Sequence, residues 1–296
     1  MYSVPFDDID KIARQMRRWN NCCKSKVLFD KLEHRQKKLL ENNKKFKDMY
    51  KGRRCFILGN APSVNKLDFD RLHDELVITV NDMFFHNDFD KLNSNFHFFA
   101  DPAYFNLSRN DQVGNQIIQQ VKGISKNTNI FLPLYAMDIA KKYGWRRNIN
   151  ISYFLQGLFF YDDYQERIDF AKSIPSFQCV IHYCIAFAVY TGCDEICLLG
   201  CDMTNLASDF SALVNESTDQ NYGYEMSEEY INYVNRLTKD IGLEYLLYGY
   251  WKIVRGFAEM YKYCIRNNVK MYNCSEESML QSIPKKKLED IISKDC

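Results

Sequence analysis

Amide and carboxylate side chains follow most of the short apolar runs in this sequence, at the point where each run ends. Asn60, Asn81 and Asp101 follow the first three runs, and Asp202 and Asn273 follow the last two. One such residue carries little weight, because Asn and Asp favour turns after strands. Five of them predict one polar cleft, since ligands bind outside the carboxyl ends of the strands in open α/β sheets. These side chains can hydrogen-bond a polar ligand, and an Asp can accept a proton from it.

The loop after the first run, Gly59–Ser63, has residue types that suit an anion or a nucleotide. Gly59 permits a tight turn, and backbone N–H groups in such a turn can cradle an anion. Asn60 and Ala61 come next, then Pro62 presets φ for a helical turn, and Ser63 can hydrogen-bond locally. The loop is neither a Walker loop nor the G-x-G-x-x-G fingerprint, which disfavours the ATP-loop and NAD-binding classes.

The apolar runs themselves predict the fold that must position these residues. They are short and continuous rather than alternating, as in strands buried on both faces of a parallel sheet. We expect strands at 54–58, 76–80, 96–100, 129–132, 195–199 and 269–272, and helices at 112–122 and 181–191. This alternation predicts an α/β fold, with a doubly wound and mostly parallel sheet.

The first 50 residues differ from the rest and predict a basic helical arm, followed by a catalytic domain over 51–296. Residues 8–49 contain no Pro or Gly, and through Arg54 there are 16 Lys and Arg against 7 Asp and Glu, a net of +9. The whole chain carries +1, so the remainder carries −8. The first alternative for the arm is a solvated helical hairpin packed on the domain. The second is a basic face on anionic lipid or on a polyanionic acceptor. Nucleic acid is disfavoured, because no recognition module accompanies the arm.

Composition predicts a cytoplasmic protein, with the inner face of a membrane left open as a peripheral location. No run of 18 apolar residues appears, and the acidic start has no apolar stretch, so neither a spanning helix nor a signal peptide is expected. The 11 Cys have neither zinc-finger spacing nor the pattern of a disulfide framework, and we expect reduced thiols and no metal site.

Several blocks resemble one enzyme family. The segment Arg54–Ser63 is similar to the glycine-asparagine-glycine-proline-serine loop of the Campylobacter-type bacterial sialyltransferases. It is also similar to the related flagellin nonulosonate transferases and archaeal-type hydroxymethyl-dihydropterin pyrophosphokinases. Val77–Phe85 resembles the strand whose terminal Asn holds the nucleotide, and Tyr183–Asp202 resembles the helix–glycine–strand block that ends in glycine-x-aspartate. Met271–Ser275 matches the usual last strand, whereas 103–175 matches poorly.

The resemblance implies a Rossmann-like, GT-A-like variant that transfers a nonulosonate sugar from a CMP-activated donor to a surface-glycan or lipid-linked acceptor. It implies that no cofactor is required. Asn60 and Asn81 would contact the nucleotide. The remaining expected donor contacts are Gly59, Ala61, Ser63, Asp101, Thr204, Tyr222, Tyr224, Asn273 and Ser275. The chain departs from the family at four places. It has Ala61 where the family has the second Gly of the loop, Phe177 where the family has an Arg, and Thr204 where the family has a Tyr. The segment 221–224, which corresponds to the part of the family's lid with the catalytic His, contains no His.

Sugar transfer needs a base for the acceptor hydroxyl and groups that offset charge on the departing phosphate. The catalytic candidates are His182, at the start of a predicted helix, and Asp202. The Tyr- and Asn-rich segment 203–250 is expected to form a lid, from which Tyr222 and Tyr224 would reach the phosphate.

Two other functions stay open, and the sequence does not decide the oligomeric state. A pyrophosphokinase that transfers from ATP to a pterin alcohol would bind Mg²⁺ through Asp101 and Asp202. A non-catalytic nucleotide-sugar-binding protein would explain the missing lid His and the Phe at 177.

Overall fold

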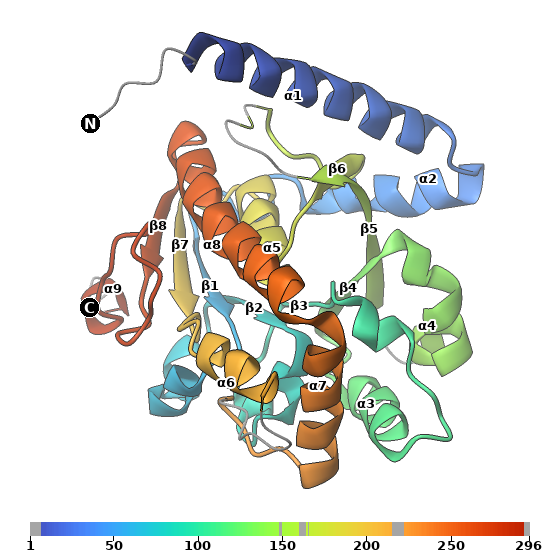
Figure 1. The fold of residues 1–296 in the computed structure, drawn as a ribbon, viewed down its shortest axis with the longest axis vertical. Coiled ribbons are helices and arrows are strands. Elements are labelled where there is room, and N and C mark those ends of the chain that lie inside the picture. The colour runs from blue at the N-terminus through green and yellow to red at the C-terminus, as the bar shows by residue number, and fades with distance from the viewer. Residues whose placement is uncertain (1–6, 148–149, 160–163, 165, 215–221, 293–296) are drawn as a thin grey trace.

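The eight strands of the described residues form a single sheet in the order β6-β5-β4-β3-β2-β1-β7-β8 in the computed structural model (Figure 1). The structure describes residues 7–147, 150–159, 164, 166–214 and 222–292. Every strand pairs with its neighbours in parallel. The strands are β1 (Arg54–Leu58), β2 (Leu76–Val80), β3 (Phe96–Phe98), β4 (Asn129–Pro133), β5 (Asn150–Phe159), β6 (Ser173–Ser176), β7 (Glu195–Leu199) and β8 (Lys270–Asn273). The predicted fold class is therefore confirmed.

Helices cover both faces of the sheet. They are α1 (Asp7–Asp30), α2 (His34–Glu41), α3 (Gln112–Gly123), α4 (Met137–Tyr143), α5 (Val180–Tyr190), α6 (Asn205–Ala212), α7 (Glu228–Ile241), α8 (Leu243–Arg266) and α9 (Glu289–Ile292). The strand residues alternate between two hydrophobic cores: Phe56 belongs to the core that includes side chains of α3 and α4, and Ile57 to the core that includes side chains of α5 and α8. Burial on both faces explains why the strands are continuous apolar runs.

The sheet has a topological switch point between β1 and β7. From β1 the chain proceeds through β2, β3, β4, β5 and β6 on one side, and it then returns through α5 to place β7 on the other side. The loops after β1 and β7 therefore lie next to each other at the carboxyl edge of the sheet. This is the place where ligands bind in open α/β sheets.

The N-terminal arm packs on the β5–β6 side of the sheet, as Figure 1 shows for α1 and α2. The Nδ2 atom of the buried Asn43 anchors its end, because it donates to the carbonyl oxygens of Tyr153 at 2.7 Å and Phe170 at 2.9 Å. A Cβ on Gly157 of β5 would lie 2.6 Å from the Ser25 Oγ of α1. Close packing of this kind agrees with the helical-hairpin alternative, and lipid contact stays a prediction.

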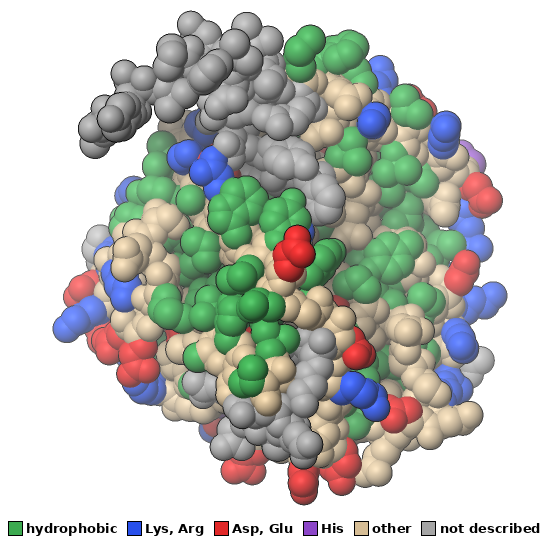
Figure 2. Space-filling view, in the orientation of Figure 1, with side chains coloured by type: hydrophobic (Ala, Val, Ile, Leu, Met, Phe, Trp, Pro, Cys, Tyr) green, Lys and Arg blue, Asp and Glu red, His purple; other side chains and the backbone are tan. Residues whose placement is uncertain are grey.

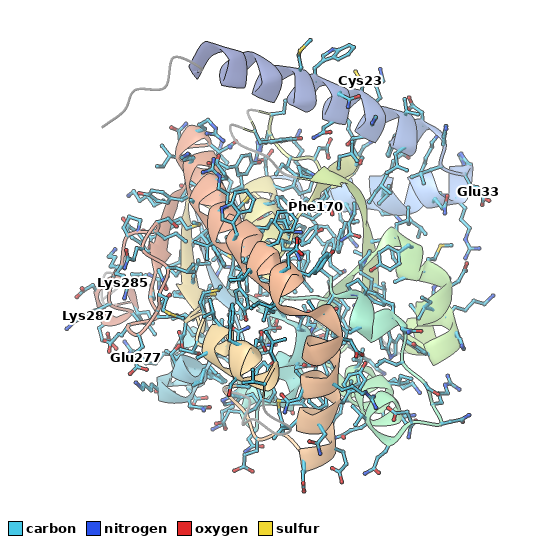
Figure 3. All side chains as sticks on the ribbon, in the orientation of Figure 1. Cys23, Glu33, Phe170, Glu277, Lys285 and Lys287 are labelled. Atoms are coloured by element: carbon cyan, nitrogen blue, oxygen red, sulfur yellow. The ribbon has the colours of Figure 1, made fainter. Side chains whose placement is uncertain are left out.

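Helix α8 buries one face and exposes the other. Phe257, Met260 and Tyr263 lie in the core, whereas Tyr245, Tyr248 and Trp251 are exposed. Figure 2 shows hydrophobic side chains gathered over this helix. In Figure 3 Phe170 lies inside the molecule, while Glu277, Lys285 and Lys287 lie at its outer edge beside β8.

Candidate functional site

The loops after β1 and β7 cross in direct backbone contact at the switch point. The Gly59 amide donates to the Leu199 carbonyl at 2.8 Å, and the Ala61 amide donates to the Gly200 carbonyl at 3.1 Å. A Cβ on Gly59 would overlap the Gly200 oxygen, and Gly200 itself has φ +62°. Two glycines are therefore needed here, one for the close approach and one for the left-handed backbone.

Ser63 and Asp202 hold the two loops together. The Ser63 amide donates to Asp202 Oδ2 at 3.0 Å, and the Ser63 hydroxyl donates to Asp202 Oδ1 at 2.6 Å. The Asp202 carboxylate is buried, and each of its oxygens accepts one of these bonds. Ser63 was expected to bond locally, and its partner is instead 139 residues away in the chain. The geometry gives Asp202 a positioning role, and its predicted catalytic role stays a prediction.

The segment that contains Tyr222 and Tyr224 lies over the first loop. The Gly223 amide donates to the Asn60 carbonyl at 2.8 Å, and a Cβ on Gly223 would lie 3.0 Å from the Ala61 oxygen. The rings of Tyr222 and Tyr224 are stacked with centroids 5.6 Å apart. Burial raises the pKa of both phenols, so both remain donors at neutral pH. Residues 215–221 of the predicted lid lie outside the described residues.

Asn81, at the end of β2, has a left-handed backbone with φ +46°. The buried His97 holds it, because its Nε2 lies 2.9 Å from the Asn81 carbonyl oxygen and its Nδ1 lies 2.8 Å from Thr79 Oγ1. A carbonyl only accepts, so Nε2 carries the proton and Nδ1 accepts from the Thr79 hydroxyl. Burial lowers the pKa of His97 to about 3, and the ring is neutral. His97 is thus a core histidine with both ring nitrogens satisfied.

Six polar atoms around this edge of the sheet are buried and have no hydrogen-bond partner among the described residues. They are Asn60 Oδ1, Asn81 Oδ1, Asp82 Oδ1, Thr204 Oγ1, the Tyr224 hydroxyl and Asn273 Nδ2. Native proteins leave few such groups, because each costs about 1–3 kcal/mol when it stays unpaired. All but Asp82 belong to the predicted donor set, and the six atoms offer acceptors and donors to a polar ligand.

Asn273 and Ser275 support the loop after β7. Asn273 Oδ1 accepts the Ser275 amide at 3.1 Å, and Ser275 Oγ in turn accepts the Cys201 amide at 3.0 Å. Both side chains are buried. Asp101 is exposed and caps its own turn, because its Oδ1 accepts the Ala103 amide at 2.9 Å. These three contacts are structural, and any contact of these residues with a donor stays a prediction.

His182 lies at the contact between α5 and α8. Its ring is 4.5 Å from that of Phe257 between centroids, and Gly256 of α8 packs directly on it. The ring is 1% exposed, its Nε2 has no partner among the described residues, and burial lowers its pKa to about 3. A base must reach the proton that it removes, so this position does not favour the predicted catalytic role.

Asp82 is a residue that the sequence reasoning did not single out. It follows Asn81 at the carboxyl end of β2 and is 7% exposed. The hydroxyl of Tyr230, on α7, donates to its Oδ2. The sequence could have indicated Asp82 as a site residue, because it is a carboxylate directly after Asn81 at the same edge of the sheet. Only Asn81, however, matched a nucleotide-binding residue of the family.

Among the residues that the structure describes, no group of three or more His, Cys, Asp or Glu side chains is placed to hold a metal ion. No described helix has the length and apolar character to span a bilayer.

No protein-family model matches the chain, and no curated protein matches it. Among solved structures it is similar to the sialyltransferase CstII from Campylobacter jejuni in complex with a substrate analogue, cytidine-5'-monophosphate. The two are 15% identical, the match covers 79% of this chain and 85% of that chain, and the TM-score is 0.42. This similarity is too low to transfer the function of that enzyme to this chain.

Proposed function

We propose that the chain is a glycosyltransferase that moves a nonulosonate sugar from a CMP-activated donor to a hydroxyl of a surface-glycan or lipid-linked acceptor. The observation that carries the proposal is the group of unpartnered polar atoms at the switch point, contributed by Asn60, Asn81, Thr204 and Tyr224. The choice of a cytidine nucleotide as donor rests on the resemblance of the sequence around Gly59–Ser63 to the sialyltransferase loop.

The loop contacts support binding of a nucleotide in this place. Ser63 and Asp202 fix the first loop, and the Gly223 amide donates to the Asn60 carbonyl, so the backbone that carries the Asn60 side chain is held before a ligand arrives. His97 does the same for the backbone of Asn81. Preorganised groups pay less ordering entropy on binding, which favours affinity.

Tyr222 and Tyr224 are proposed to meet the departing phosphate. Their phenols stay protonated because burial raises the pKa of each, and the Tyr224 hydroxyl has no partner among the described residues. Hydrogen bonds to a leaving group that gains charge stabilise the transition state more than the ground state. Phe177, where the related enzymes have an Arg, is buried beside Tyr183, so a cation from that position plays no part in the proposal.

The test is binding and turnover with a nucleotide panel. Calorimetry should detect CMP in preference to UDP, GDP and ATP, and incubation with CMP-activated nonulosonates should release CMP. Binding of ATP with Mg²⁺ but not of CMP would instead support the pyrophosphokinase alternative. CMP binding with neither transfer nor hydrolysis of any CMP-sugar would support the non-catalytic alternative.

Asn60→Ala and Asn81→Ala should each weaken CMP binding by roughly 5- to 150-fold, the equivalent of about 1–3 kcal/mol for one lost partner of a buried group. Asn129→Ala is a matched control. Its Oδ1 is equally unpartnered, but it begins β4 at the opposite edge of the sheet. Equal loss of CMP affinity in all three variants would contradict the proposed site.

A further inference from the structure

Asp82 has one carboxylate oxygen in use and one without a partner. Tyr230 donates its hydroxyl to Oδ2, whereas Oδ1 is buried and has no hydrogen-bond partner among the described residues. The side chain as a whole is 7% exposed. Burial of an ionised carboxylate with a free oxygen is costly, so a structural role alone does not account for it.

The groups that face Asp82 are phenols and one carboxylate. The negative charge of Asp82 contributes to the raised pKa of five phenols, those of Tyr104, Tyr222, Tyr224, Tyr230 and Tyr233. Repulsion by the Asp101 carboxylate in turn raises the pKa of Asp82. Among the described residues, the groups that shift its own pKa include no cation. Tyr230 comes from α7, while Tyr222 and Tyr224 precede that helix, so the surroundings of Asp82 are built largely by the segment over the sheet edge.

We propose that Asp82 is the general base that takes the proton of the acceptor hydroxyl, and that Tyr230 is the positioning residue that holds its carboxylate. This assignment rests on the proposed glycosyltransferase function and names its acceptor subsite. The subsite takes a hydroxyl-bearing acceptor beside the donor bound at Asn81.

The step balances within the two substrates and this side chain. The acceptor oxygen forms a bond to the anomeric carbon while its proton moves to Asp82 Oδ1. The bond between that carbon and the phosphate oxygen of CMP breaks, and its electron pair leaves with the phosphate. Asp82 then loses the proton to solvent, so the carboxylate is restored for the next turnover.

The properties of the group suit this task. Burial raises the pKa of Asp82 to about 6, and hydrogen bonding from the phenols of Tyr230 and Tyr104 opposes part of that increase. A base with this pKa is ionised at pH 7.5 and is more basic than an ordinary Asp. The other candidates have competing contacts: Asp202 binds Ser63 with both oxygens, and His182 lies under α8.

The first experiment compares Asp82→Asn with the wild-type enzyme. CMP release should fall at least about 100-fold, as expected for loss of a general base. CMP affinity should stay within threefold, because Asp82 is not assigned to the donor. If the wild type neither binds CMP nor turns over a CMP-sugar, the proposed function fails. If the wild type is active and Asp82→Asn transfers normally, only the base assignment fails.

Asp209 supplies a matched control. Its Oδ2 also accepts from a tyrosine, with the Tyr250 hydroxyl at 2.5 Å, and burial also raises its pKa. It lies on α6 rather than at the end of a strand. Asp209→Asn should keep at least half of the wild-type rate. Loss of turnover in Asp209→Asn with retention in Asp82→Asn would overturn the assignment.

Tyr230→Phe gives a readout that mere structural damage would not produce. The Tyr230 hydrogen bond lowers the pKa of Asp82, so its removal should raise that pKa. The acidic limb of the pH profile of kcat/KM, expected near pH 6 in the wild type, should move to higher pH. An active Tyr230→Phe enzyme with an unmoved acidic limb would overturn the proposal, even if Asp82→Asn does not fold.

Discussion

Residue types at the sheet edge act in two distinct ways, as ligand-facing groups and as braces for the loops. Ser63 and Asp202 show the second way, because their contact joins the loops that follow β1 and β7. The carboxylate is buried, and its partners are one backbone amide and one hydroxyl. Charge-assisted hydrogen bonds of this kind are about twice as strong as neutral ones.

Ser63→Ala should destabilise the fold and weaken CMP binding together. The change removes the hydroxyl that donates to Asp202 Oδ1 and leaves this buried oxygen unsatisfied, at a cost of about 1–3 kcal/mol. Chemical denaturation measures the first effect and calorimetry measures the second. Ser125→Ala, at an exposed serine whose hydroxyl accepts the Asn127 amide within its own turn, should lower the free energy of unfolding by less and leave CMP binding unchanged. An unfolding free energy that is equal in Ser63→Ala and wild type would show that this contact does not brace the loops.

Sequence reasoning found the edge of the sheet but could not assign each side chain its partner. Asn60 and Asn81 were predicted to bind a nucleotide, and both have unpartnered oxygens in the structure. Asp202 was also placed at this edge, but its contact with Ser63 joins residues far apart in the chain, which no local pattern reveals. Asp82 was missed for a related reason, because its partner Tyr230 comes from α7, 148 residues further on.

At the scale of the elements, the six predicted strands were found and two were missed. β1, β2 and β7 have the predicted bounds, since each is a continuous apolar run buried on both faces. Strand β5 contains Asn150, Ser152, Gln156 and Gly157, which interrupt the apolar pattern. Strand β6 is short, contains Pro175 and lies at the edge of the sheet, where proline is tolerated. The limit predicted for the lid, residue 250, falls inside α8, which continues to Arg266.

Gly256 and Gly249 of α8 allow a matched test of how this helix packs. A Cβ at Gly256 would lie 2.9 Å from His182 Nδ1 and closer still to its Cε1, whereas nothing lies within 4 Å of a Cβ at Gly249. Gly256→Ala should therefore destabilise the fold by about 1–3 kcal/mol, because overpacking separates α8 from α5. Gly249→Ala should stabilise it by up to about 1 kcal/mol through helix propensity.

Chemical denaturation of both variants checks this prediction. Alanine improves helix propensity equally at the two positions, so the difference between the variants isolates the contact with His182. Gains of similar size in both variants would mean that α8 does not pack on His182 as closely as the structure indicates.

Over the whole molecule, buried titratable groups link stability to pH. Burial lowers the pKa of His97 and of His182 to about 3 in the folded state. Below pH 6.5 the unfolded chain binds protons at these rings and the folded chain does not, so acid favours unfolding. As the pH falls from 8 to 5, each ring lowers the free energy of unfolding by about 2 kcal/mol.

Asp82 works in the opposite direction. Its pKa is raised to about 6 in the folded state, so between about pH 6 and pH 4 the folded chain binds a proton that the unfolded chain does not. At pH 5 this proton raises the free energy of unfolding by about 1 kcal/mol. The sum of the three groups is a net loss of about 3 kcal/mol from pH 8 to pH 5.

His182→Phe removes one titrating ring from a site formed by Phe177, Phe257 and Gly256. That variant should lose about 2 kcal/mol less than wild type over the same interval, as urea denaturation at the two pH values would measure. His34→Gln, at an exposed histidine of the arm, should leave the wild-type difference unchanged. A His182→Phe variant with the full wild-type loss would mean that this ring is protonated in the folded protein, and so less buried than its contacts with α8 require.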